Sequence, residues 1–151
     1  MKTYATKTAD IKRQQHVIDA SGQILGRLAT QAACLLMGKH KPIFSRIEDT
    51  GDIVVVINAA KVRVTGKKAH QKMYYSHSGF PGGFKEITYE ALMAKDPTLV
   101  IHHAVNGMLP HTFMSAKMKR RLKVFAGAAN PELVPPPKAP KAEAPSASEA
   151  K

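Results

Sequence analysis

Five consecutive β-branched residues, Ile53 to Ile57, constrain the fold of this chain more than any other stretch. They stand between Asp52 and Asn58, and a strand of this composition is apolar on both of its faces. Strands of that kind occupy the covered interior of a parallel or mixed sheet. The run therefore predicts the centre of the hydrophobic core.

The residues on either side of this strand predict further elements. His16 to Ile18 form a short strand pattern that ends in a turn at residues 19–22. Between Leu25 and Leu36, apolar residues recur at spacings of three and four, which is the period of a helix with one apolar face. Gly38 stands where the C-terminal cap of that helix is expected. Val62 to Thr65 alternate in the period of a half-buried strand.

The second half of the chain predicts three helices. Thr88 is a suitable N-terminal cap for a short one. Asp96-Pro97 supplies a cap and a first-turn proline for another, which Pro110 ends. The last helix is predicted over Ser115 to Phe125, with a narrow apolar seam and a basic remainder.

The charge of the chain indicates an anionic partner. Its 151 residues amount to one domain, and 23 Lys and Arg against 11 Asp and Glu give a net charge of +12. After Asn130 three acidic residues and three lysines cancel, so the body of the chain carries all of the net charge. Such a field favours nucleic acid or an anionic membrane surface.

Membrane insertion and an oxidising compartment are not predicted. No apolar run approaches the ~20 residues that span a bilayer. The first fifteen residues are polar and lack the apolar middle of a secretory signal. The single cysteine, Cys34, excludes an internal disulfide, and its apolar neighbours favour a buried thiol. We therefore expect a cytosolic protein.

The stretch from Lys61 to Lys85 has the composition of a phosphate-binding surface. It holds six Lys and Arg residues, no Asp or Glu, and several aromatic rings and glycines. Cations neutralise a polyanion, rings stack on unpaired bases, and glycines let the backbone approach closely. A solvated charged hairpin is the alternative, and the rings in the Gly-Pro loop could equally anchor the loop to the body. The predicted RNA contacts here are Arg63, Lys67, Lys68, Lys72, Tyr74, Tyr75, His77 and Lys85.

Two other segments gather basic residues. The predicted last helix has no acidic residue, whereas a helix that serves solubility would pair its lysines with glutamates. The loop after the first helix is also basic. These segments add Lys39, Lys41, Lys117, Lys119, Arg120, Arg121 and Lys123 to the predicted RNA contacts.

Catalytic, metal and cofactor sites are not predicted. A phosphate-binding loop needs a glycine five residues before its Gly-Lys pair, and that position holds Ala33 before Gly38-Lys39 and Lys61 before Gly66-Lys67. Asp49 and Asp52 precede a strand, where acids more often form turns and caps than catalytic or metal sites. The histidines are scattered along the chain, so no zinc site is expected.

Eight short motifs follow one another along the chain. They run over His16 to Ala20, Leu25 to Ala29, Gly38 to Lys41, Asp49 to Asp52, Val56 to Ala59, Thr65 to Lys68, Tyr75 to Gly83 and Gly107 to Pro110. In this order they resemble the bacterial large-subunit ribosomal proteins of the "L thirteen" family. The resemblance covers Lys2 to about Gly127.

This resemblance implies an α/β fold with three α/β/α layers around a four-stranded, mainly parallel sheet. It implies a structural, non-enzymatic role in the large ribosomal subunit of the cytoplasm, where the chain would bind large-subunit rRNA, contact neighbouring ribosomal proteins and support early assembly. No small-molecule substrate, cofactor, membrane or homo-oligomer is expected. We predict a basic N-terminal arm at residues 1–15, an rRNA-binding domain at residues 16–127 and an Ala- and Pro-rich disordered tail at residues 128–151.

Two other function classes are alternatives. A nucleotide-binding α/β enzyme would also contain a buried strand followed by glycines and lysines, but it would need the phosphate-binding loop that is missing. A general nucleic-acid chaperone would act through disordered arms, whereas the charge here lies in the body of the chain. Both are less consistent with the sequence than a structural rRNA-binding protein.

Overall fold

The computed structural model describes residues 4–128, and most of the predicted tail lies outside these residues. Three segments in this range are short helical turns: η1 (Thr8–Asp10), η2 (Ala59–Lys61) and α2 (Lys68–Gln71). The longer helices are α1 (Leu25–Met37), α3 (Tyr89–Lys95), α4 (Pro97–Met108) and α5 (Phe113–Arg120). The strands are β1 (Gln15–Asp19), β2 (Ile53–Ile57), β3 (Met73–His77), β4 (Phe84–Thr88) and β5 (Leu122–Val124).

The central position of β2 is confirmed. It pairs in parallel with β1 on one side and with β5 on the other. Val54, Val55 and Val56 are fully buried, as the run of β-branched residues predicted. Hydrogen-bonded neighbours on both edges and apolar side chains on both faces explain why this segment needs no polar residue.

The sheet differs from the predicted one in size. Among the described residues it has three strands, while β3 and β4 form a separate antiparallel pair. The segment Val62 to Thr65 was expected to be a strand, and Val62 is indeed buried while Arg63 is exposed. Its backbone bonds, however, go to the loop before α1: Arg63 donates to the Gln23 carbonyl and accepts from Leu25 N–H, both at 2.9 Å. Only a single parallel bridge, Ile24 to Arg63, results.

The predicted helix from Ser115 to Phe125 is wrong in both of its ends. The helix begins at Phe113 and ends at Arg120, and Leu122–Val124 forms β5. Leu122 is buried against the core and Lys123 points to solvent, which is the alternation of a strand. Pairing with the free edge of β2 outweighs the local helical preference of this basic segment.

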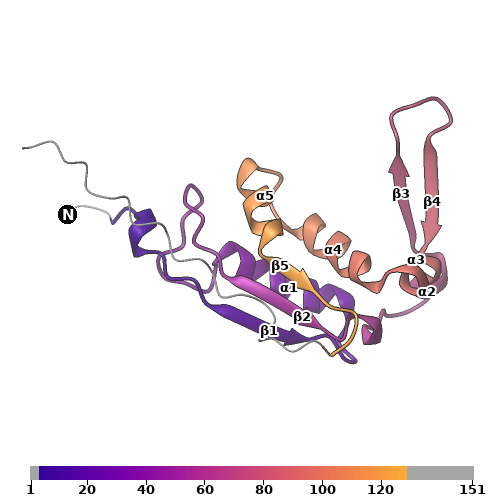
Figure 1. Ribbon diagram of the computed structural model, residues 1–151, viewed down its shortest axis with the longest axis horizontal. Coiled ribbons are helices and arrows are strands. Elements are labelled where there is room, and N and C mark those ends of the chain that lie inside the picture. Colours follow the sequence, from indigo (N-terminus) through magenta and orange to yellow (C-terminus); the bar gives the residue numbers. More distant parts are fainter. Residues whose placement is uncertain (1–3, 129–151) are drawn as a thin grey trace, which may run out of the picture.

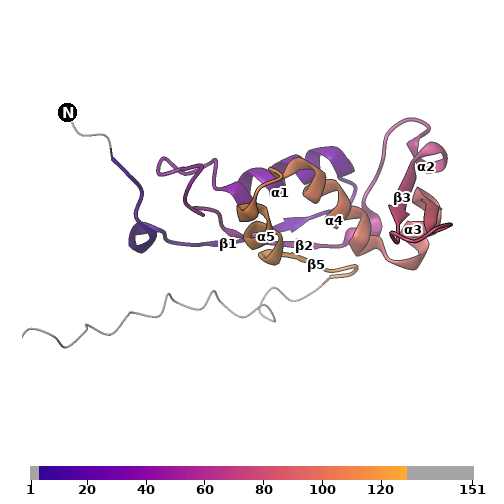
Figure 2. The same cartoon turned by 90° about the horizontal axis from the view of Figure 1, so that it is seen from above.

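The core lies between one face of the sheet and two helices. Val54 and Val56 pack with Leu28 and Leu36 of α1 and with residues of α4, whereas Val55 points to the opposite face. Figure 2 shows α1 and α4 on the same side of the sheet. The described elements therefore form one helical layer on the parallel sheet, and a second helical layer is not observed among them.

The predicted helix ends are confirmed at three places. The Asp96 carboxylate accepts a hydrogen bond from Thr98 N–H at 3.0 Å, with Pro97 in the first turn of α4. The Thr88 hydroxyl accepts from Ala91 N–H at 3.3 Å at the start of α3. Gly38 ends α1 with φ 78°, and a Cβ there would lie 2.9 Å from the backbone of Thr50. Glycine at this position permits both the left-handed conformation and the close approach.

Candidate nucleic-acid interface

The hairpin of β3 and β4 displays exposed aromatic rings. Figure 1 shows the two strands projecting away from the body of the molecule. The rings of Tyr75 and Phe84 stack on each other, with centroids 5.6 Å apart, and both are more than half exposed. Phe80, at the tip, is 74% exposed. Exposed rings that lie outside the core are suited to stacking on nucleobases.

Tyr74 has a different environment from its neighbour Tyr75. Its ring is half-buried, 5.5 Å from the ring of His103 in α4 and 5.2 Å from the Lys72 ammonium group. The hydroxyl is buried without a hydrogen-bond partner among residues 4–128. Burial, with a smaller effect of Tyr89, raises the pKa of Tyr74 above its ordinary value. Tyr74 thus anchors the hairpin to the body, and Tyr75 faces solvent.

Most of the predicted cationic contacts are exposed and have no ion-pair partner among residues 4–128, although Lys72 and Lys117 each lie over an aromatic ring. Ten of the predicted Lys and Arg contacts form no ion pair within residues 4–128, and all of these except the half-buried Lys72 are exposed. The ten are Lys39, Arg63, Lys67, Lys68, Lys72, Lys85, Lys117, Lys119, Arg120 and Lys123. His77 is exposed on the hairpin, where its Nδ1 accepts from Gly79 N–H at 2.9 Å. Unpaired exposed cations can contact an external polyanion without breaking an internal bond.

Two of the predicted contacts are instead occupied within the protein. Arg121 is 11% exposed, binds both carboxylate oxygens of Asp49 and donates to the backbone carbonyls of Asp52 and Leu36. Lys41 is 13% exposed and binds Asp52 Oδ1 at 2.5 Å and the Lys12 carbonyl at 2.7 Å. Both side chains therefore hold loops together within the protein.

Asp52, the partner of Lys41, is the centre of a cluster of polar groups. It is fully buried, and besides Lys41 it accepts from Gln14 N–H at 2.9 Å and faces the Nε2 atoms of His16 and His40. Burial by itself raises the pKa of Asp52, but the hydrogen bonds from Lys41, Gln14 and His16 together hold it below its ordinary value. The sequence predicted turns and caps for the acids before this strand, whereas Asp49 and Asp52 form buried ion pairs with Arg121 and Lys41.

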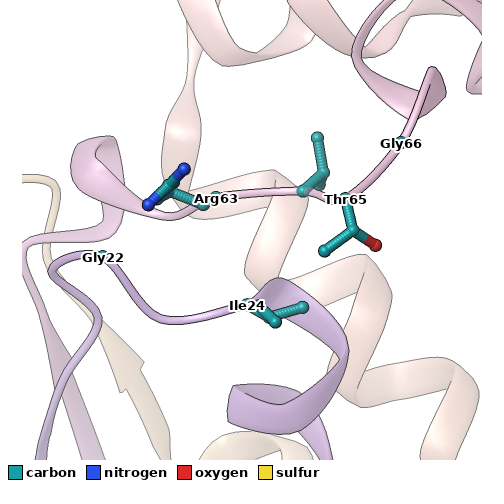
Figure 3. A pocket seen from close by; sticks show the side chains of 6 residues that line it. Gly22, Ile24, Arg63, Thr65 and Gly66 are labelled. Carbon is teal, nitrogen blue, oxygen red and sulfur yellow. The ribbon is translucent and has the colours of Figure 1, made fainter.

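The cations fall into two groups, one near the hairpin and one around α5. Arg63 lines a cavity of about 400 Å³ together with Gly22, Ile24, Val64, Thr65 and Gly66. Figure 3 shows Arg63 and Thr65 on the segment that lies across from Ile24. Lys68 and Lys72 line an adjacent cavity of about 290 Å³ that shares Ile24, Val64 and Thr65. We call Arg63, Lys67, Lys68, Lys72 and Lys85 the hairpin-side group.

The second group surrounds α5. Lys117, Lys119 and Arg120 belong to this helix, and Lys123 follows in β5. Lys39 lines a largely apolar cavity of about 300 Å³ with Met114 and Met118 of α5. Figure 1 shows α5 well separated from the hairpin, with α4 running between them. We call Lys39, Lys117, Lys119, Arg120 and Lys123 the α5-side group.

Comparison with known proteins identifies the family. The sequence model described as "Ribosomal protein L13" matches residues 13–131. The chain belongs to the ribosomal protein L13 family. This confirms the resemblance seen in the eight motifs, and the L13 family is a ribosomal family rather than a class of enzymes.

Individual members of the L13 family are similar over nearly their whole length. "Large ribosomal subunit protein uL13" of Pseudomonas putida is 57% identical over 137 residues, which are 91% of this chain and 96% of that protein. The protein of the same name from Roseiflexus is 52% identical over 138 residues, 91% of this chain and 94% of the relative. That of Salinispora arenicola is 55% identical over 131 residues, 87% and 89% of the two chains.

Among residues 4–128, no helix combines the length and apolarity that crossing a bilayer requires.

Proposed function

We propose that this chain is a structural component of the large ribosomal subunit in the cytoplasm, that it binds large-subunit rRNA, and that it supports early assembly of the subunit. The observation that carries the proposal is the set of ten cationic side chains without an ion-pair partner among residues 4–128, on a member of the L13 family. Cations in this state release the counterions of a polyanion when they bind it.

The two groups of cations suggest how assembly is supported. The hairpin-side group and the α5-side group belong to separate parts of a body that shares one hydrophobic core (Figure 1). Each group neutralises phosphates, so a single bound protein holds two RNA segments at a fixed separation. Phosphate repulsion opposes such close approach of RNA segments in the absence of protein.

The aromatic residues divide between anchoring and contact. Tyr75, Phe84 and Phe80 offer exposed ring faces to unpaired bases or sugars, and His77 lies on the same hairpin. Tyr74 fixes the orientation of the hairpin through its packing on α4. Lys41 and Arg121 contribute indirectly, because they hold the two segments that carry the α5-side group: the loop with Lys39, and α5 with β5.

Sucrose-gradient sedimentation of cell lysate at low and high salt tests the proposal. We expect the chain to sediment with the large subunit and to stay there at high salt. Recovery of the chain at the top of the gradient under both conditions would refute a ribosomal role. A purified complex should then show an affinity for rRNA that falls with salt by roughly 0.7–0.9 log units per neutralised phosphate for each log unit of salt.

A further inference from the structure

Three potential metal ligands converge at one edge of the sheet. His16 belongs to β1, His40 lies in the loop after α1, and Asp52 immediately precedes β2. The Nε2 atoms of His16 and His40 lie 3.0 and 2.9 Å from Asp52 Oδ2. The three ligand atoms all lie within 4.8 Å of one another. No ion pair or hydrogen bond within residues 4–128 occupies Asp52 Oδ2 apart from these two imidazoles.

The rest of the cluster fixes the orientation of the carboxylate. Asp52 Oδ1 accepts from the Lys41 ammonium group and from Gln14 N–H. This oxygen is therefore occupied, and Oδ2 is directed at the two imidazoles. The imidazole rings meet edge to face, with an interplanar angle of 84°. Asp52 is fully buried, but the two histidine side chains are 30% and 34% exposed, which leaves a path from solvent.

We propose that His16, His40 and Asp52 bind one divalent transition-metal ion of the zinc class through Nε2, Nε2 and Oδ2. In tetrahedral zinc sites ligand distances of about 2.0–2.2 Å place the ligand atoms roughly 3.3–3.6 Å apart. The Nε2–Oδ2 distances of 3.0 and 2.9 Å are shorter than this separation, so both imidazoles must move away from Oδ2 to admit an ion. The three protein ligands leave a fourth position on the solvent side for water or another oxygen ligand.

The chemistry of the cluster selects the ion. Two of the three ligands are imidazole nitrogens, which suit zinc, cobalt and copper, whereas magnesium and calcium prefer oxygen. The positive charge of Lys41 beside Asp52 disfavours ions that bind by charge alone. A metal ligand must offer an unprotonated nitrogen, so protons compete with the metal for Nε2 and binding weakens as the pH falls.

This site could not be inferred from the spacing of the histidines. The pairing of β1 with β2, in the register that sets Gln15 opposite Ile53, brings His16 to Asp52. The loop that carries His40 reaches the same carboxylate because Asp52 N–H donates to the Leu35 carbonyl near the end of α1, at 3.1 Å. The site is also independent of RNA binding, because it involves no residue of the hairpin-side group or the α5-side group. A failure of one proposal leaves the other intact.

The test is a titration of the purified full-length chain with CoCl₂, followed by displacement with ZnCl₂. We expect one equivalent of Co²⁺ to give the visible absorption of a tetrahedral nitrogen and oxygen site, and Zn²⁺ to abolish it. The double variant H16Q/H40Q should bind at least tenfold more weakly. The matched control H77Q/H111Q also removes two imidazoles, both exposed, and should bind as the wild type does. Mg²⁺ should not compete.

A second measurement on the wild type avoids any dependence on the folding of a variant. In long-range proton–nitrogen spectra of the imidazoles, Zn²⁺ should shift the Nε2 signals of His16 and His40 alone. Absence of a Co²⁺ spectrum, unchanged binding by H16Q/H40Q, or shifts confined to other histidines would each overturn the proposal.

Discussion

Replacing Arg121 by alanine is expected to lower the free energy of unfolding by about 3 kcal/mol. Removing one partner of a buried ion pair typically costs about 3–5 kcal/mol, because the remaining charge stays buried. Asp49 is 9% exposed and would lose both of its bonds to Arg121. Arg13, 3.5 Å from Asp49 and partly exposed, offers some compensation, which places the expected cost at the low end of this range.

The neighbouring residue supplies a matched control for this prediction. Arg120 has the same charge and adjoins Arg121, but it is exposed and has no ion pair within residues 4–128. Its replacement by alanine should change the free energy of unfolding by less than about 0.5 kcal/mol. Urea unfolding followed by circular dichroism measures both variants. For a domain of this size, about 3 kcal/mol corresponds to a fall in Tm of roughly 10 °C.

A second substitution, which removes the charge of Asp49, separates two contributions to the lost stability: the missing attraction to Arg121 and the burial of an unpaired carboxylate. Asp49→Asn added to Arg121→Ala should recover part of the lost stability, because no ionised carboxylate is then left buried. Equal stabilities for the Arg121 and Arg120 alanine variants would contradict this reasoning. Arg121 would then have to be counted among the exposed RNA contacts of the α5-side group.

Three further predictions concern the hairpin side and the Asp52 cluster. Lys67→Glu with Lys68→Glu should weaken rRNA binding in a filter assay and leave the urea midpoint unchanged; a strongly destabilised variant would make these lysines structural. Tyr74→Ala should cost about 1–3 kcal/mol of stability and Tyr75→Ala less than about 0.5, both by urea unfolding; equal costs would contradict the anchoring role. Because the pKa of Asp52 is depressed in the folded state, its ionised form stabilises the fold above the unfolded pKa of about 3.9, and this contribution is lost as the pH falls through the folded pKa. Asp52→Asn should therefore flatten the fall of the urea midpoint below about pH 4, and an unchanged acid profile would contradict the assignment.

The parts of the fold that were predictable from sequence are those with a local cause. The burial of β2 follows from five β-branched residues, and the start of α4 follows from Asp96-Pro97. The strand β5 was missed because three residues, Leu122 to Val124, are too few to show a period. Its pairing with β2 depends on contacts between residues far apart in the sequence.

For the candidate interface, too, the sequence predicted the features that have a local pattern and missed those that depend on contacts between distant residues. Composition identified the basic segments, and it placed Tyr74 and Tyr75 together without distinguishing them. Only the fold shows that one ring packs against His103 and the other faces solvent. Likewise Arg121 belongs to a run of basic residues in sequence, and its partner Asp49 is 72 positions away. Long-range ion pairs of this kind leave no local pattern.

The division between inward and outward cations also separates two ways of losing RNA affinity. Under the proposed function, an outward side chain such as Arg120 contacts a phosphate directly, so its loss should reduce affinity and the salt slope while the fold stays intact. Arg121 acts by holding the junction of α5 and β5, so its loss reduces affinity only through the population of folded chain. A stabilising osmolyte restores the folded population without replacing a phosphate contact. Sucrose should therefore recover rRNA binding by the Arg121→Ala variant and leave that of Arg120→Ala unchanged, and recovery of both to the same degree would mean that neither side chain touches RNA.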